Sequence, residues 1–130
     1  MVKCALVRPV STRIRFGALG EDAAADLLRS GGYRIVARNH RCARGEIDLI
    51  AEKGELLVFV EVRTRATAAF GGPEETVNQR KQRRVIAAAR DYLAQRRGPA
   101  KAARFDVIAV VDGPDGPALT HFENAFDAGP

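Results

Sequence analysis

The predicted elements follow the order helix, three strands, helix and two strands, which favours an α/β fold with a mixed sheet and a helix on each side. Apolar residues recur at helical spacing from Phe16 to Gly31 and again over 78–97, while five other segments have strand character. One of them, Leu56–Val60, is a continuous apolar run, as expected for a central strand covered on both faces. With 130 residues, the chain has the length of one domain, which we assign to residues 16–126.

The first helix is expected to begin at Phe16, after a basic amino-terminal segment. Residues 1–15 contain four basic side chains and no acidic one, so we predict a flexible basic arm there. Gly31-Gly32 ends the helix, because glycine tolerates the positive φ of a helix terminus. Glu21 falls at the edge of the apolar stripe of this helix rather than on its solvent face.

The strands are expected between turn residues. Their predicted ranges are 33–39, 45–52, 55–64, 104–111 and 118–123. Lys53-Gly54 is the expected turn between the second and third strands, and an Ala-, Gly- and Pro-rich loop over 66–73 precedes the second helix. Residues 127–130 are expected to form a loose tail.

Basic charge is concentrated on the second helix. The chain has 21 Lys and Arg against 16 Asp and Glu, a net charge of +5. Residues 77–97 hold seven basic side chains and one acid, so this segment carries +6 and the rest of the chain −1. Clustered arginine favours salt-dependent binding of a polyanion such as nucleic acid, whereas the alternative is an ordinary solvated helix face. The expected nucleic-acid contacts are Arg80, Lys81, Arg83 and Arg84.

Few aromatic residues lie among these arginines, which argues against a stacking platform for single strands and favours a duplex or branched nucleic acid. Cys4 and Cys42 lack C-x-x-C spacing, so the sequence predicts neither a disulfide framework nor a zinc site. No segment approaches the roughly 18 apolar residues of a membrane span, and the apolar stretch 4–7 is too short for a secretory signal. We therefore expect a cytoplasmic protein with no membrane partner.

Two strands contain carboxylates where apolar residues are expected. Asp48 and Glu61 each interrupt an otherwise apolar strand, which strand propensity disfavours. In the register set by the expected turn, Asp48 opposes Phe59 and Glu46 opposes Glu61. Asp48 and Glu61 are then diagonal neighbours on one face, with Cα atoms roughly 7–8 Å apart. Arg63 projects from the same face, two residues after Glu61.

Two carboxylates this close can share one divalent cation whose other ligands are water, which is how Mg²⁺ is commonly held. Such a cation stabilises charge on phosphate and lowers the pKa of an attacking water, so the pattern favours phosphodiester hydrolysis. Glu21 is a candidate for a further acid, and Arg63 for a group that orients water or stabilises the transition state. The alternative is that Glu46 and Glu61 mark strand ends and pair with Arg44 and Arg63.

Neither histidine has an evident partner in the sequence. His40 and His121 are expected to be structural. Asp106 lies near the start of its strand, where we expect a turn or strand-end role rather than support of the carboxylate pair.

Several motifs in a fixed order resemble the bacterial YraN family of uncharacterised proteins. The resembling segments are Gly20–Ala24, Gly45–Ile50, Val58–Arg63, Phe70–Pro73, Val77, Arg80–Arg84 and Arg104–Val107. Together they extend over roughly residues 16–124. That family is similar to the restriction-endonuclease superfamily, and most similar to the archaeal Holliday-junction resolvases.

The resemblance implies a restriction-endonuclease-like α-β-β-β-α-β core and a PD-(D/E)xK type of site. Glu21 would match the helix acid, Asp48 the first strand acid and Glu61 the second, while Arg63 stands where the pattern has lysine. Asp48 and Glu61 would be the metal ligands, with Mg²⁺ as cofactor and Mn²⁺ as its substitute. DNA is favoured over RNA, and a homodimer is an expectation from the resemblance alone. Arginine stays protonated and is bulkier than lysine, so nuclease activity does not follow from the fold.

Three functions are therefore open at this point. The first is a nucleic-acid-binding protein with Mg²⁺-dependent endonuclease activity on structured or branched DNA. The second is a nucleic-acid-binding protein with weak or no catalysis, because arginine replaces the lysine. The third is an interaction module whose basic helix docks an acidic protein.

Overall fold

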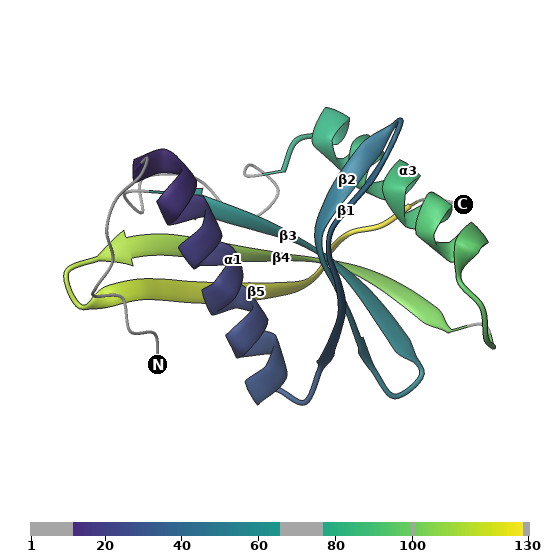
Figure 1. Ribbon diagram of the computed structural model, residues 1–130, viewed down its shortest axis with the longest axis horizontal. Helices are drawn as coiled ribbons and strands as arrows, with labels where there is room; N and C mark the ends of the chain where they lie inside the picture. Colours follow the sequence, from purple (N-terminus) through teal and green to yellow (C-terminus); the bar gives the residue numbers. More distant parts are fainter. Residues whose placement is uncertain (1–11, 66–76, 100, 129–130) are drawn as a thin grey trace.

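The computed structural model in Figure 1 describes residues 12–65, 77–99 and 101–128. Its strands are β1 (Arg34–Cys42), β2 (Gly45–Lys53), β3 (Leu56–Arg65), β4 (Ala102–Gly113) and β5 (Gly116–Phe126). They form one five-stranded sheet in the order β1-β2-β3-β4-β5. Helix α1 (Thr12–Ser30) packs on one face of the sheet and helix α3 (Gln79–Gln95) on the other. The predicted α/β fold with a mixed sheet is confirmed.

The strand directions explain why the sheet is mixed. β1, β2 and β3 pair antiparallel, β3 and β4 pair parallel, and β4 and β5 form an antiparallel hairpin. β2 pairs with β1 as far as Gly45 but with β3 only over Leu49–Lys53. The sheet therefore forks at Asp48, and the free end of the β1–β2 hairpin bends toward α3 (Figure 1).

The continuous apolar run of β3 supplies the cores on both faces. Val58 and Val60 pack in the cluster beneath α1, whereas Leu57 and Phe59 pack in the cluster beneath α3. All four side chains are fully buried. Each helix contributes alanines to its cluster, and these small side chains let the helix lie close to the sheet. No helix in the described part of the chain is both long enough and apolar enough to span a membrane.

Helix α1 begins earlier than predicted. It starts at Thr12 rather than Phe16, so residues 12–15 are helical and the predicted arm is wrong for them. Residues 1–11 lie outside the described part of the chain. The loop predicted over 66–73 and the last two residues of the predicted tail also lie outside it.

The other boundaries differ by a few residues. β1 ends at Cys42, and the β4–β5 hairpin is longer at both ends than predicted. Asn78 caps α3 instead of belonging to it, because its side-chain oxygen accepts a hydrogen bond from the backbone N–H of Lys81 at 2.9 Å. The helix ends at Gln95, before Gly98.

Asp106 lies inside β4 at the centre of a buried polar network. The expected turn or strand-end role is therefore wrong. Arg104 donates two hydrogen bonds to its carboxylate, both of 2.8 Å, and His121 Nε2 lies 2.7 Å from it. The backbone N–H of Asn124 donates at 3.0 Å, and Arg104 also donates to the Tyr33 hydroxyl at 2.7 Å. Burial raises the pKa of Asp106, but these hydrogen bonds outweigh it and hold the pKa below its usual range.

The network predicts a large effect of Asp106→Ala on stability. Removing this carboxylate leaves the mostly buried Arg104 and His121 without their shared partner, so the free energy of unfolding should fall by about 3 kcal/mol. Urea denaturation measures this difference. Asp112→Ala, at an exposed position of the same strand, is the control and should change stability by less than about 0.5 kcal/mol. Equal stability of the two variants would contradict the importance of the network.

Candidate functional site

Asp48 and Glu61 face each other at the fork of the sheet. The β2–β3 register pairs Ile50 with Phe59 and Leu49 with Val60, and its continuation by one residue places Asp48 opposite Glu61. Beyond this point the backbone ladder ends. The N–H of Val62 donates instead to Asp48 Oδ2 at 2.9 Å, which fixes the orientation of that carboxylate.

The expected register is wrong by two residues. The turn is formed by Gly54-Glu55 instead of Lys53-Gly54, since Lys53 pairs with Leu56 across it. Gly54 has a φ of +60°, which glycine adopts without strain. Asp48 therefore does not oppose Phe59. A slip of two residues keeps every side chain on its face, so Asp48 and Glu61 still share a face but are direct rather than diagonal neighbours.

Glu61 is the most buried acid of the site, with 3% of its surface exposed. Its Oε2 lies 3.2 Å from Lys81 Nζ, while its Oε1 is buried and has no hydrogen-bond partner in the described part of the chain. Burial and the charge of Asp48 raise the pKa of Glu61 to about 8, although Lys81 opposes this shift. Burial also raises the pKa of Asp48, against the hydrogen bond from Val62.

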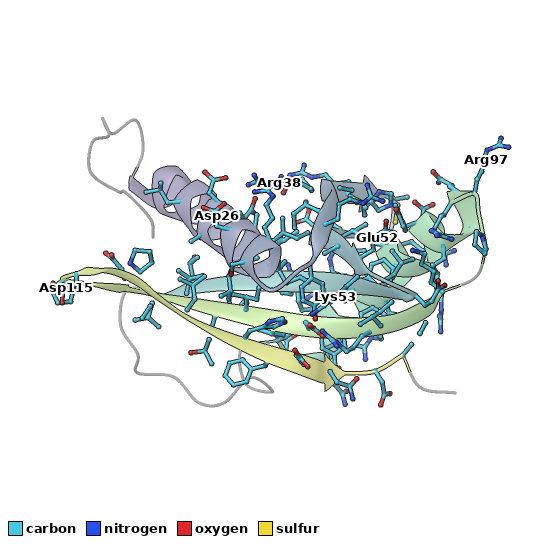
Figure 2. The ribbon with its side chains drawn as sticks, turned by 90° about the horizontal axis from the view of Figure 1, so that it is seen from below. Asp26, Arg38, Glu52, Lys53, Arg97 and Asp115 are labelled. Atoms are coloured by element: carbon cyan, nitrogen blue, oxygen red, sulfur yellow. The ribbon has the colours of Figure 1, made fainter. Side chains whose placement is uncertain are left out.

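Glu21 approaches the pair from α1. Burial and the negative charge of Asp48 raise the pKa of Glu21. Arg38 from β1 lies between α1 and the β1–β2 hairpin (Figure 2), with Nη2 3.7 Å from Glu21 Oε1 and 2.9 Å from Asp22 Oδ1. Among the described residues, no three His, Cys, Asp or Glu side chains form a metal-binding group. Glu21 thus lies beside the pair but does not complete a three-carboxylate site.

Two glycines allow the elements that carry the acids to approach closely. A Cβ at Gly20 would lie 2.4 Å from the Thr64 side chain of β3, so α1 can pack here only without a side chain. A Cβ at Gly45 would lie 1.9 Å from the backbone oxygen of Arg84 in α3. Gly20 directly precedes Glu21, and Gly45 begins the strand of the first acid. Because Gly20 and Gly45 have no side chain, α1 can pack closely on β3 and the start of β2 can pack closely on α3.

The hairpin end is held on α3 by a further polar contact. His40 Nε2 of β1 lies 3.1 Å from Asp91 Oδ2, and its ring meets that of Tyr92 edge-on at 5.4 Å. His40, like His121, thus has an aspartate partner in the fold, and these partners are not evident from the sequence. The contact joins β1 to α3 near the open end of the β1–β2 hairpin.

The ion pairs of the strand carboxylates involve partners other than those considered from the sequence. Glu46 pairs with Arg41 at 3.5 Å, where the sequence suggests Arg44. Glu61 pairs with Lys81, where the sequence suggests Arg63. Arg63 is half-buried on β3, two residues after Glu61.

The predicted nucleic-acid contacts separate into two groups on α3. Arg80, Arg83 and Arg84 are exposed, and none of them forms an ion pair or side-chain hydrogen bond with another residue of the described segments. Lys81 is half-buried and directed at Glu61. The sequence could place all four on one helix but not show that Lys81 turns inward.

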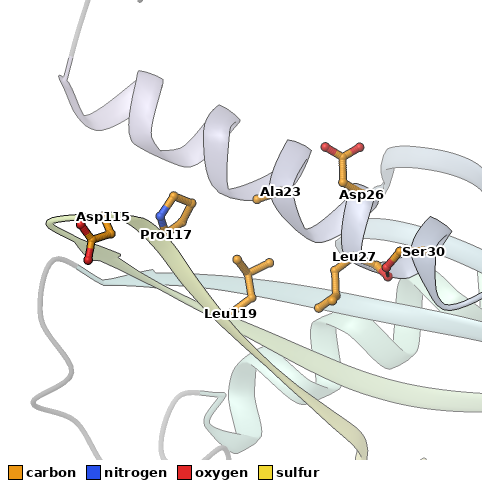
Figure 3. A pocket seen from close by; sticks show the side chains of 7 residues that line it. All are labelled: Ala23, Asp26, Leu27, Ser30, Asp115, Pro117 and Leu119. Carbon is orange, nitrogen blue, oxygen red and sulfur yellow. Dashed lines mark hydrogen bonds between the residues drawn. The ribbon is translucent and has the colours of Figure 1, made fainter. Parts of the chain in front are cut away.

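Hollows that are lined by described residues also occur away from the carboxylate pair. One of about 370 Å³ separates the β1–β2 turn from α3 and includes Arg44 and Arg90 in its lining. Another, of about 340 Å³, lies between α1 and the β4–β5 hairpin (Figure 3). Asp26, Leu27 and Leu119 contribute to it, and none of the predicted site residues does. The second hollow is therefore separate from the candidate site.

The carboxylate pair fits a divalent cation of the hard, oxygen-binding kind. It offers two carboxylates from rigid strands, and Glu61 Oε1 is a buried acceptor that lacks a donor in the described structure. Mg²⁺ is commonly held by one or two carboxylates with water as the remaining ligands. Asp48 and Glu61 are the residues that would hold it.

Comparison with known proteins gives consistent results. The sequence model of "Uncharacterised protein family UPF0102" matches residues 20–110, which include every predicted site residue. A UPF0102 protein of Anaeromyxobacter dehalogenans is 52% identical over 115 residues, which cover 88% of this chain and 86% of the relative. One from Moorella thermoacetica is 52% identical over 99 residues, covering 76% and 82%. UPF0102 protein STH1475 of Symbiobacterium thermophilum is 50% identical over 115 residues, covering 88% and 98%.

The raised pKa of Glu61 predicts a pH-dependent stability. The folded protein holds this proton up to about pH 8, whereas the unfolded chain releases it near the ordinary value of 4.5. The free energy of unfolding should therefore fall as the pH rises from about 5 to 8. In Glu61→Gln, the fall in the free energy of unfolding that is caused by Glu61 should disappear. Thermal unfolding at several pH values measures this difference.

Glu55→Gln, in the exposed β2–β3 turn, removes a carboxylate without changing the pair and should retain the decline. If Glu61→Gln declined as steeply as the natural protein, Glu61 would be charged across this pH range and its assigned environment would be wrong.

Proposed function

This chain belongs to the uncharacterised protein family UPF0102, or YraN, and we propose that it binds nucleic acid through the exposed arginines of α3 and holds a divalent cation between Asp48 and Glu61. The observation that carries the proposal is the direct opposition of the half-buried Asp48 and the buried Glu61, whose Oε1 has no partner in the described residues, beside a strongly basic helix. Both features suit a phosphodiester accompanied by a cation.

The charge of α3 supports a polyanionic partner. Arg80, Arg83 and Arg84 have exposed guanidinium groups that are not neutralised by acidic neighbours in the described residues. Arg44 and Arg90 line the adjacent hollow between the hairpin and the helix. Arginines spread over a surface in this way contact backbone phosphates with little dependence on sequence. Duplex or branched DNA is the expected partner, and a homodimer follows only from the resemblance to resolvases.

The residues of the pair have distinct tasks in this proposal. Val62 N–H holds the Asp48 carboxylate in one orientation, and Glu61 would offer its unpartnered Oε1 to the cation. A cation held there would neutralise charge on a bound phosphate and lower the pKa of a coordinated water. Mg²⁺ is the expected cation, with Mn²⁺ as a substitute.

Arg63 favours a second candidate function, which is binding without efficient cleavage. It occupies the position that the PD-(D/E)xK pattern assigns to lysine. A guanidinium can pair with a carboxylate or grip a phosphate, but it does not release a proton to act as a base. We therefore propose Mg²⁺-dependent phosphodiester hydrolysis as the chemistry of the site and expect it to be weak in the natural protein.

Binding to duplex or branched DNA should weaken steeply with salt. Replacing Arg80, Arg83 and Arg84 with Ala should lower the affinity and reduce the slope of log K against log salt by up to about 0.9 for each lost phosphate contact. Fluorescence anisotropy at several salt concentrations measures both.

The charge-matched control replaces Arg29, Arg34 and Lys53 with Ala. These residues lie around the carboxyl-terminal end of α1, and their replacement should leave the slope of log K against log salt unchanged. An unchanged slope in the α3 variant would show that another surface contacts the backbone. Absence of salt-dependent DNA binding would leave an acidic protein as the partner of the helix.

Cleavage tests the cation and Arg63 together. On a panel of branched, duplex and single-stranded DNA with Mg²⁺ or Mn²⁺, the natural protein should cleave weakly or not at all. Arg63→Lys should increase cleavage, and Asp48→Asn in that background should abolish it by removing a metal ligand.

Robust cleavage by the natural protein would show that arginine substitutes well for lysine. Retained cleavage after the loss of Asp48 would contradict the assigned cation site. No cleavage by the lysine variant on any substrate would favour a binding protein.

A further inference from the structure

We propose that Lys81 has two positions, one on Glu61 when the carboxylate pair lacks a cation and one on the nucleic-acid backbone when a divalent cation takes its place. This inference rests on the function proposed above, because it needs both ligands to bind. It makes Lys81 the link between the cation site and the basic surface of α3. The two ligands would then favour each other's binding.

The backbone of Lys81 is held by the helix, whereas its side chain is partly exposed. Lys81 lies in the first turn of α3, where its N–H donates to the Asn78 cap at 2.9 Å. Its side chain is 30% exposed, whereas the side chain of its partner Glu61 is only 4% exposed. The side chain therefore spans the boundary between the buried pair and the surface, and a rotation about its own bonds can move Nζ outward.

The helix places Lys81 at the border of two faces. Val85, four residues later, is fully buried in the core beneath α3. Arg84, three residues later, is exposed and belongs to the basic face. Residues three and four apart on a helix are neighbours, so Lys81 lies beside both. An outward movement of its ammonium group would bring it to the surface that we assign to the phosphate backbone.

A divalent cation and Lys81 compete for the same carboxylate. Lys81 Nζ lies 3.2 Å from Glu61 Oε2, and Oε1 of the same group is the unpartnered buried acceptor. A cation bound by this carboxylate would carry twice the charge of the ammonium group and repel it at short range. The contact of Lys81 with Glu61 would then be replaced by the contact with the cation.

Lysine suits this exchange better than the other cations near the pair. Arg38 is shared between Glu21 and Asp22, so it already has its own carboxylate partners. The ammonium group of lysine is a compact charge on a flexible stem, whereas guanidinium is planar and needs a fixed geometry. Lys81 is also the residue whose ion pair with Glu61 the structure records.

The test compares the salt dependence of DNA binding with and without Ca²⁺, a hard cation that carboxylates bind. For the natural protein, the slope of log K against log salt should be steeper with Ca²⁺ by up to about 0.9, the contribution of one further phosphate contact. Lys81→Gln should lose this difference. Arg80→Gln is the matched control, and it should lower both slopes and keep the difference.

Calorimetry without DNA gives a second readout. Above about pH 8, where Glu61 no longer holds a proton, Lys81→Gln should bind Ca²⁺ several-fold more tightly than the natural protein, because the competing charge has gone. Lys81→Arg, which keeps the charge, should not gain affinity. Thermal unfolding of each variant establishes that it is folded before either ligand is added.

The outcomes separate this inference from the function on which it rests. If the natural protein bound neither DNA nor Ca²⁺, the proposed function would be wrong. If it bound both and Lys81→Gln kept the Ca²⁺-dependent change of slope, the function would stand and the two positions of Lys81 would be refuted. Unchanged Ca²⁺ affinity in Lys81→Gln would likewise contradict the competition.

Discussion

Asp48 and Glu61 are held opposite each other, largely out of water, by the elements around the fork of the sheet. Asp48 and Glu61 raise each other's free energy as long as both are charged, and burial increases this cost. The cost can be relieved by a proton, by the ammonium group of Lys81 or by a divalent cation. The pKa of Glu61, raised to about 8, corresponds to relief by a proton. The contact between Lys81 and Glu61 corresponds to relief by an ammonium group.

The fold keeps the pair in place from several directions. The last backbone contacts between β2 and β3 lie next to Asp48, and Val62 orients it from the neighbouring strand. Gly45 lets the open end of the β1–β2 hairpin rest on α3, while Gly20 lets α1 approach β3. At the other side of the sheet, the network around Asp106 ties β4 to β5. The repulsion between Asp48 and Glu61 is thus confined to the fork between β2 and β3.

The periodic parts of the fold could be predicted from the sequence, but the contacts between elements could not. Helical spacing and the apolar run of β3 are local properties, so the element order and the layers were predictable. The register was missed because Gly54 can occupy either position of a two-residue turn. The prediction that Asp48 and Glu61 share a face still holds, since a slip of two residues keeps every side chain on its face of the sheet.

Other features depend on tertiary contacts that no local pattern reveals. The residues of the Asp106 network are spread from Tyr33, which accepts from Arg104, to Asn124, and they meet only when the sheet has formed. The inward turn of Lys81 depends on how α3 is rotated against the sheet. By composition Lys81 is one more basic residue of a basic helix, and only its distance from Glu61 distinguishes it.

Paramagnetic broadening by Mn²⁺ shows directly whether Asp48 and Glu61 hold a divalent cation. Substoichiometric Mn²⁺ added to the ¹⁵N-labelled protein should first broaden the amide signal of Val62, which donates to Asp48. The amide of Asn124 donates to Asp106, whose carboxylate is already occupied by Arg104, so this signal should persist. Asp48→Asn should abolish the selective loss at Val62. Equal broadening of both signals, or selective loss that survives in Asp48→Asn, would contradict the account.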